Sequence, residues 1–120
     1  MYQHSFEKFI VWQDSIHLVE QIYKTVNVFP SDEKFGLISQ MKRSAVSIYS
    51  NLAEGTSRIT KKDKAHFSTI AFSSTVELLC QVIISHRLQF ISKEAYFNLR
   101  EQILKVSNKI NALRKSQLNV

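Results

Sequence analysis

Residues 36–55 constrain the fold more than any other part of this chain, because two chemically different rows of side chains recur there at helical spacing. One row is large and apolar: Leu37, Met41, Ile48 and Leu52. The other is polar and mostly small, at steps of four, three and four: Arg43, Ser47, Ser50 and Glu54. Faces that only meet water usually carry Lys, Glu and Gln, so small side chains indicate close approach by another element. The polar row therefore predicts an assembly interface rather than a catalytic site.

The rest of the chain also carries apolar residues at alternating steps of three and four, which is typical of helices packed lengthwise against one another. The spacing predicts four helices at about residues 9–28, 32–57, 61–88 and 93–115. Pro30 ends the first helix, and Ser31 or Asp32 can cap the second. Thr60 and Ser92 are the expected caps of the third and fourth helices.

The composition favours one all-α domain over residues 1–120. The chain has 120 residues with 44% hydrophobic content, which suffices for one core. Only two Gly and one Pro leave little material for the tight turns of a β-sandwich or barrel. Because the connections between the expected helices are short, neighbouring helices must be antiparallel. The sequence therefore predicts an up-down-up-down four-helix bundle.

The third expected helix carries two apolar stripes. One consists of Ala65, Phe72, Val76, Leu79 and Ile83, and the other of Phe67, Ala71, Leu78 and Val82. The two stripes are displaced by roughly a third of the helix circumference at 3.6 residues per turn. A helix in a lone bundle needs only one such stripe, so we expect the second one, Phe67 to Val82, to pack on another subunit. This feature predicts a homo-oligomer.

Charge and cysteine usage limit the class of protein. The formal net charge of +6 favours anionic partners without indicating an obligate nucleic-acid arm. The single cysteine, Cys80, cannot form an intrachain disulfide, and its apolar neighbours suggest a small core residue. The N-terminus lacks a signal-peptide pattern, and we expect no apolar stretch to approach the roughly 20 residues that a membrane span needs. We expect a cytoplasmic protein without a membrane partner.

No catalytic or metal-binding motif stands out. The four histidines are His4, His17, His66 and His86, and none has a second His or Cys at ligand spacing. His17 shares a helix face with Asp14 and Glu20, for which a solvated face is the favoured interpretation over a metal or acid–base site. Phosphate-cradling loops and nucleophile elbows are absent, and Arg43 and Glu54 fit helix or subunit contacts better than catalysis. We expect no enzyme and no cofactor.

Basic residues gather in two places. The turn before the third helix carries Arg58, Lys61, Lys62 and Lys64, and the fourth helix carries a row: Arg100, Lys105, Lys109, Arg114 and Lys115. The turn is the better candidate for nucleic acid, because amides at a helix N-terminus add to phosphate binding by nearby lysines. The alternative is that these lysines are the ordinary solubility coat of a helical protein.

Several motifs together resemble a known family. They are Phe6, Val11-Trp12-Gln13, Ile22-Tyr23, Phe29-Pro30, Gly36-Leu37 and Ser39-Gln40, followed by the ten positions Arg43, Ala45, Val46, Ser47, Ile48, Ser50, Asn51, Ala53, Glu54 and Gly55. The last set matches the central Arg-x-Ala-Val-Ser-Ile-x-Ser-Asn-x-Ala-Glu-Gly pattern of the 23S ribosomal RNA intervening-sequence protein family. The chain has Tyr49 where many relatives have proline, which removes an expected kink.

The resemblance implies a four-helix bundle that assembles into a ring, typically a homopentamer, with a basic surface. The family includes proteins encoded inside insertions in ribosomal RNA genes. It is similar to accessory proteins of diversity-generating retroelements, which bind a reverse transcriptase and nucleic acid. Two hypotheses follow: a non-enzymatic ring that binds RNA or DNA nonspecifically, or a scaffold for a larger protein partner such as a reverse transcriptase.

Overall fold

The computed structural model describes residues 9–118, so His4 and Phe6 lie outside the described residues. Four α-helices make up most of this range: α1 (Ile10–Val26), α2 (Leu37–Thr56), α3 (Lys61–Arg87) and α4 (Lys93–Leu118). A short 3-10 helix, η2 (Ser31–Glu33), precedes α2. Residues 9–118 contain no β-strand, which confirms the predicted all-α class with four helices.

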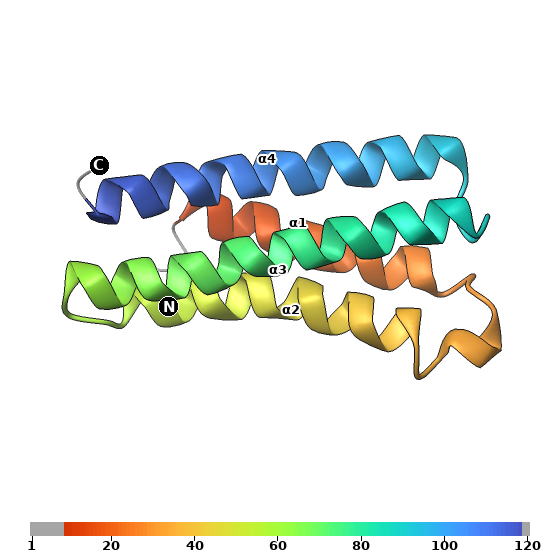
Figure 1. Ribbon diagram of the computed structural model, residues 1–120, viewed down its shortest axis with the longest axis horizontal. Helices are drawn as coiled ribbons and strands as arrows, with labels where there is room; N and C mark the ends of the chain where they lie inside the picture. The colour runs from red at the N-terminus through yellow and green to blue at the C-terminus, as the bar shows by residue number, and fades with distance from the viewer. Residues whose placement is uncertain (1–8, 119–120) are drawn as a thin grey trace, which may run out of the picture.

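The four helices lie lengthwise beside one another (Figure 1). α3 packs most extensively on α2 and on α4, and α1 contacts the same two helices less extensively. The turn that joins α2 to α3 and the turn that joins α3 to α4 lie at opposite ends of the molecule (Figure 1). α3 is therefore the element on which the packing of the bundle most depends.

The core lies between all four helices and is built from aliphatic side chains. Fully buried members from each helix include Leu18 and Ile22 of α1, Ile48 of α2, Leu78 of α3 and Ile103 of α4. α1 also carries Trp12, whose ring meets Tyr49 edge to face with 6.4 Å between the centroids. α2 continues as one helix through Tyr49.

The expected assignment of the two α3 stripes is wrong. Ala71, Leu78 and Val82, which we expected at a subunit interface, are each 0% exposed within the single chain. Val76, which belongs to the stripe expected to face the core, is 49% exposed. The stripe predicted to face a neighbour therefore lies nearest the bundle axis. Of the other stripe, Ala65 is buried and Phe72 and Leu79 pack against the core, while Val76 is exposed.

Buried hydroxyls explain the error. The core-facing row of α3 includes serines and a threonine among its aliphatic residues: Ser68, Ala71, Thr75, Leu78, Val82 and Ser85. Thr75 donates its hydroxyl to the carbonyl of Phe72 (2.6 Å), and Ser85 donates to the carbonyl of Gln81 (2.7 Å). These local hydrogen bonds offset the cost of burying a hydroxyl. A pattern that counts only apolar residues misses such positions.

Helix starts agree with the expected caps in two cases of three. Thr60 Oγ1 accepts a hydrogen bond from the Asp63 amide (3.1 Å), and Ser92 Oγ accepts one from the Ala95 amide (3.1 Å). The expected start of the second helix at 32 is wrong, because the backbone at Gly36 leaves the helical region and separates η2 from α2. The Glu33 carboxylate, not Ser31 or Asp32, accepts from the first α2 amide, that of Leu37 (3.1 Å).

Two further expectations about α3 need correction. Cys80 is exposed rather than part of the core. Among the described residues, α3 is long and apolar enough, by length and composition only, to cross a membrane. This differs from the expectation that no apolar stretch reaches the length of a membrane span. A core helix of a bundle passes the same test, yet only 33% of that apolar segment is buried here. Val76 and Ile84 are the large apolar side chains of α3 that are exposed within the described residues.

Replacing Leu78 by alanine should destabilise the protein by about 2–5 kcal/mol, because a fully buried leucine leaves a cavity when truncated. The matched control is Leu104→Ala on α4, at a position that is 39% exposed, for which we expect a loss of about 0.5 kcal/mol or less. Urea unfolding followed by circular dichroism measures both values. Equal losses would contradict the placement of Leu78 in the core.

Candidate functional site

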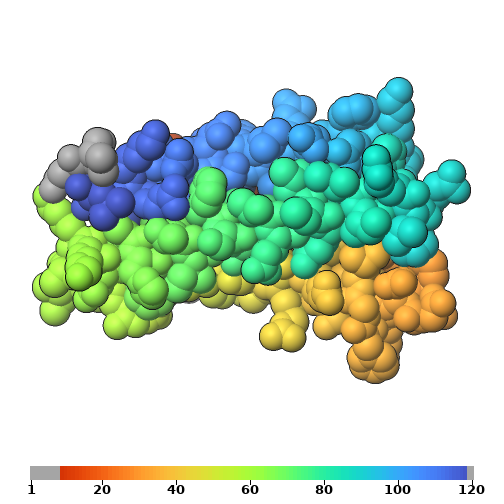
Figure 2. All heavy atoms as spheres, in the orientation of Figure 1, coloured from red at the N-terminus to blue at the C-terminus, as the bar shows by residue number. Residues whose placement is uncertain are grey.

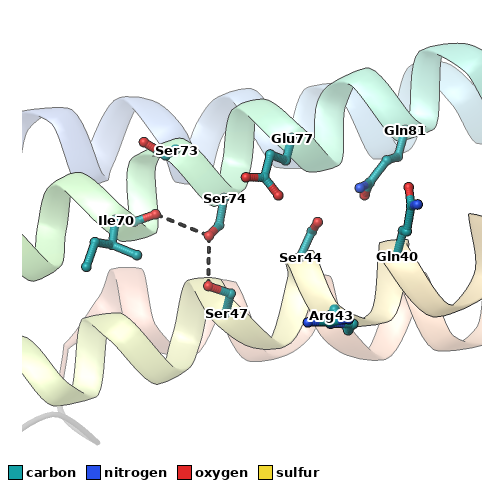
Figure 3. A pocket seen from close by; sticks show the side chains of 9 residues that line it. All are labelled: Gln40, Arg43, Ser44, Ser47, Ile70, Ser73, Ser74, Glu77 and Gln81. Atoms are coloured by element: carbon teal, nitrogen blue, oxygen red, sulfur yellow. Dashed lines mark hydrogen bonds between the residues drawn. The ribbon is translucent and has the colours of Figure 1, made fainter.

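A polar groove runs between α2 and α3 (Figure 3). Its volume is about 440 Å³, and its lining comes from both helices: Gln40, Arg43, Ser44, Ser47, Ile70, Ser73, Ser74, Glu77 and Gln81. Arg43 and Ser47 belong to the polar row that the sequence singled out. The residues from α3 were not predicted, because they lie far from α2 in sequence and no spacing within one helix points to them.

A chain of hydrogen bonds joins α2 to α3 at the floor of this groove (Figure 3). Asn51 Nδ2 donates to Ser47 Oγ (3.0 Å), and Ser74 donates its hydroxyl to the Ile70 carbonyl (3.1 Å). The Ser47 and Ser74 oxygens lie 2.8 Å apart. Because the Ser74 proton is used on Ile70, Ser47 must be the donor to Ser74. The small residues thus hold the two helices close together.

The walls of the groove carry one cation and one anion. Arg43 and Glu77 are exposed, and neither forms an ion pair with another of the described residues. Gln40 of α2 and Gln81 of α3 point toward each other across the groove (Figure 3). Gln81 Oε1 is buried and has no hydrogen-bond partner within residues 9–118. The groove can therefore receive polar and charged groups from outside the chain.

The outer face of α3 borders this groove and is apolar. We call Val76, Cys80, Ile83 and Ile84 the outer α3 stripe; Val76 is 49% and Ile84 is 41% exposed. Figure 2 shows this side of the molecule, with the green to teal surface of α3 between those of α2 and α4. Solvent-exposed faces of monomeric proteins rarely carry contiguous apolar side chains of this kind, so this stripe is a candidate contact surface.

The predicted interface residues of α2 have mixed surroundings. Arg43, Ser50 and Glu54 are exposed, as an outward contact surface requires. Ser47 is half-buried and engaged with α3, as described above. Phe67 of α3 is also half-buried, beneath the guanidinium of Arg58 from the turn that precedes α3. Of the residues predicted at an interface, only the three exposed ones are freely accessible on the surface of the chain.

The four basic residues expected to bind nucleic acid lie around the turn between α2 and α3. We call Arg58, Lys61, Lys62 and Lys64 the basic turn; the first three are exposed and Lys64 is half-buried. The Arg58 guanidinium pairs with Glu54 Oε1 and lies over a ring, 4.5 Å from the centroid of Phe67. Arg58 is therefore held in place by contacts within the chain.

The position of this turn depends on the close approach of α2 and α3 at Gly55. A Cβ atom added there would lie 3.3 Å from Phe67 Cβ and 3.5 Å from the Lys64 carbonyl oxygen. The first of these distances is tighter than an ordinary van der Waals contact. Glycine thus allows the two helices to meet where Phe67 supports Arg58.

Three of the five basic residues of the α4 row are engaged within the chain. Lys109 pairs with Asp14 Oδ2 (2.5 Å), and Arg100 donates to the Tyr96 hydroxyl (2.9 Å). The Arg114 guanidinium lies 4.7 Å from the centroid of the Phe72 ring. Lys105 and Lys115 of the same row are exposed.

Residues 9–118 hold no group of three or more His, Cys, Asp or Glu side chains that could bind a metal ion. The side chains of Asp14, His17 and Glu20, which share a helix face in the sequence, do not converge on one point. His17 approaches Glu20 (3.7 Å) on an exposed face, while Asp14 turns toward Lys109.

The helices and surfaces described here define a four-helix bundle with a basic turn and an apolar outer face. The chain belongs to the 23S rRNA-intervening sequence protein family, which matches residues 7–112. A crystal structure from Bacteroides thetaiotaomicron VPI-5482, described as a protein with unknown function from the S23 ribosomal protein family, is similar in fold. It has 22% sequence identity and a TM-score of 0.79, over 88% of this chain and 99% of that one. The comparison with curated proteins finds no match.

Replacing Gly55 by leucine should destabilise the protein by about 1–3 kcal/mol, because the larger side chain meets Phe67 and the α3 backbone. Ser50→Leu, at an exposed position of the same helix, should change the stability by about 0.5 kcal/mol or less. Denaturant unfolding of both variants measures the difference. If Gly55→Leu were as stable as the parent, the helices could not be as close as described.

Proposed function

We propose that the protein is a non-enzymatic, up-down-up-down four-helix bundle that assembles into a ring and binds nucleic acid nonspecifically through the basic turn. The observation that carries the proposal is the gathering of Lys61, Lys62 and Lys64 with Arg58 at one turn of the bundle. The net charge of +6 adds to the attraction for a polyanion. Family membership supports the proposal, because the family is named for a sequence that intervenes in 23S rRNA.

The basic turn has the physical properties that phosphate binding needs. Lys61 and Lys62 are exposed at the start of α3, where their ammonium groups can reach phosphate oxygens. Arg58 is already ordered by Glu54 and Phe67, so less side-chain entropy is lost when it contacts a ligand. In a ring the turn would recur in every subunit, and several weak contacts would act together on one strand.

The ring is proposed from the outer α3 stripe and the adjoining groove. Val76, Cys80, Ile83 and Ile84 leave an apolar surface that a second copy of the chain would cover. The groove offers Arg43 and Glu77, which have opposite charges and no ion-pair partner within the described residues, so they would add polar contacts at the rim. A pentamer is the stoichiometry that the family resemblance favours.

A second candidate function is a scaffold for a larger protein such as a reverse transcriptase. The outer α3 stripe favours it to the same extent, because an apolar face can be covered by any partner of matching shape. The two functions differ in what remains bound after nuclease treatment. A stoichiometric protein partner that survives the treatment would favour the scaffold.

Reversing the charge at Lys61 and Lys62 together (Lys61→Glu, Lys62→Glu) should weaken binding to a mixed RNA or DNA pool and lower the slope of log affinity against log salt by about 2. Fluorescence anisotropy across a salt series measures both quantities. The physical reason is that each lysine–phosphate contact releases counterions when it forms, so losing two such contacts lowers the number of counterions released on binding.

The matched control reverses two exposed lysines of α4, Lys105→Glu and Lys115→Glu, and therefore changes the net charge by the same amount. This variant should keep most of the salt slope. If the two double variants lost affinity equally, net charge rather than the basic turn would govern binding, and the proposed site would be misplaced.

Val76→Glu should dissociate the ring, because a carboxylate in the outer α3 stripe would be buried without a partner. Light scattering should then give a mass near the 13.9 kDa of one chain, with unchanged helix content. Leu104→Glu introduces the same group at an exposed apolar position of α4 and should leave the mass of the parent unaltered. A Val76→Glu variant with the parent mass would place the interface elsewhere.

A further inference from the structure

The tip of the turn between α2 and α3 carries an isoleucine that has almost no contact with the rest of the chain. Ile59 is 95% exposed, more than any other large apolar side chain of the described residues. Its side chain branches at Cβ and is therefore stiff. An aliphatic group held in water on all sides contributes nothing to the core, so its position at this tip calls for a different explanation.

The backbone on both sides of Ile59 is fixed. The Ser57 amide donates to the Glu54 carbonyl (3.1 Å), and the Arg58 amide donates to the Gly55 carbonyl (3.3 Å). On the other side, Thr60 caps α3 through the amide of Asp63. The tip is therefore presented in one orientation before any ligand arrives, which lowers the entropy lost on binding.

The neighbours of Ile59 favour an anionic partner. Arg58, Lys61 and Lys62 are all exposed within three residues of it. Nucleic acid carries phosphates outside and apolar base faces behind them, so it fits an apolar tip surrounded by cations. An anionic membrane also offers negative charge in front of an apolar layer. However, one isoleucine buries far less surface than a single acyl chain, which by itself anchors a protein only marginally.

We infer that Ile59 inserts between bases at an interrupted step of the nucleic acid whose phosphates are held by Lys61 and Lys62. This inference rests on the proposed function and names the form of ligand that the same turn prefers. Burying one isoleucine and separating two stacked bases involve free energies of similar size, so insertion into an intact duplex gains little. A bulge or an unpaired step is already open, and there the burial is not offset by unstacking.

The test compares a short RNA duplex with the same duplex containing a single-nucleotide bulge, using fluorescence anisotropy on the full chain. The parent should bind the bulged duplex about tenfold more tightly, and Ile59→Ser should lose this preference while keeping its salt slope. Ile10→Ser makes the same chemical change at another exposed isoleucine, 67% exposed at the start of α1. This control should retain the preference.

The other outcomes separate the inference from the proposed function. Equal binding of both duplexes by the parent, or a preference that survives in Ile59→Ser, would overturn the inference and leave phosphate binding intact. A parent that binds neither duplex at low salt would overturn the proposed function as well. Binding to phosphatidylserine vesicles that depends on Ile59, with RNA binding unchanged in Ile59→Ser, would assign the tip to lipid and overturn the inference.

Discussion

The close packing of α2 against α3 is the constraint on which the rest of the structure depends. Small side chains make it possible: Ser47 and Ser74 share a hydrogen bond of 2.8 Å, and Gly55 leaves room for Phe67. Each hydroxyl in this contact has a partner, so the polar atoms are buried at little cost. The contact brings together residues separated by 27 positions in the chain.

Both candidate surfaces follow from that packing. Where α2 ends and α3 begins, the Phe67 ring packs against the Arg58 guanidinium and helps to hold the basic turn in position. Along its length α3 gives one row of side chains to the core and turns the outer α3 stripe, from Val76 to Ile84, away from it. In the proposed assembly, a helix divided in this way would contribute both to the bundle and to a contact outside it.

The sequence was sufficient to predict the four helices and the caps Thr60 and Ser92, because helical periodicity and capping chemistry are local. It wrongly placed Ala71, Leu78 and Val82 at a subunit interface. The core-facing row was hard to recognise because it includes Thr75 and Ser85, buried hydroxyls that form hydrogen bonds within their own helix. The basic turn was predictable because its residues are neighbours in the chain. The groove was not, because Gln81 and Gln40 meet only after the helices pack.

In the proposed assembly the outer α3 stripe is covered by another copy of the chain. The most direct test is the mass of the unmodified protein in solution, measured by light scattering over a range of protein concentration and at low and high salt. We predict a species several times heavier than 13.9 kDa that persists at high salt, because salt does not screen an apolar contact. A 13.9 kDa species at every concentration would contradict the claim.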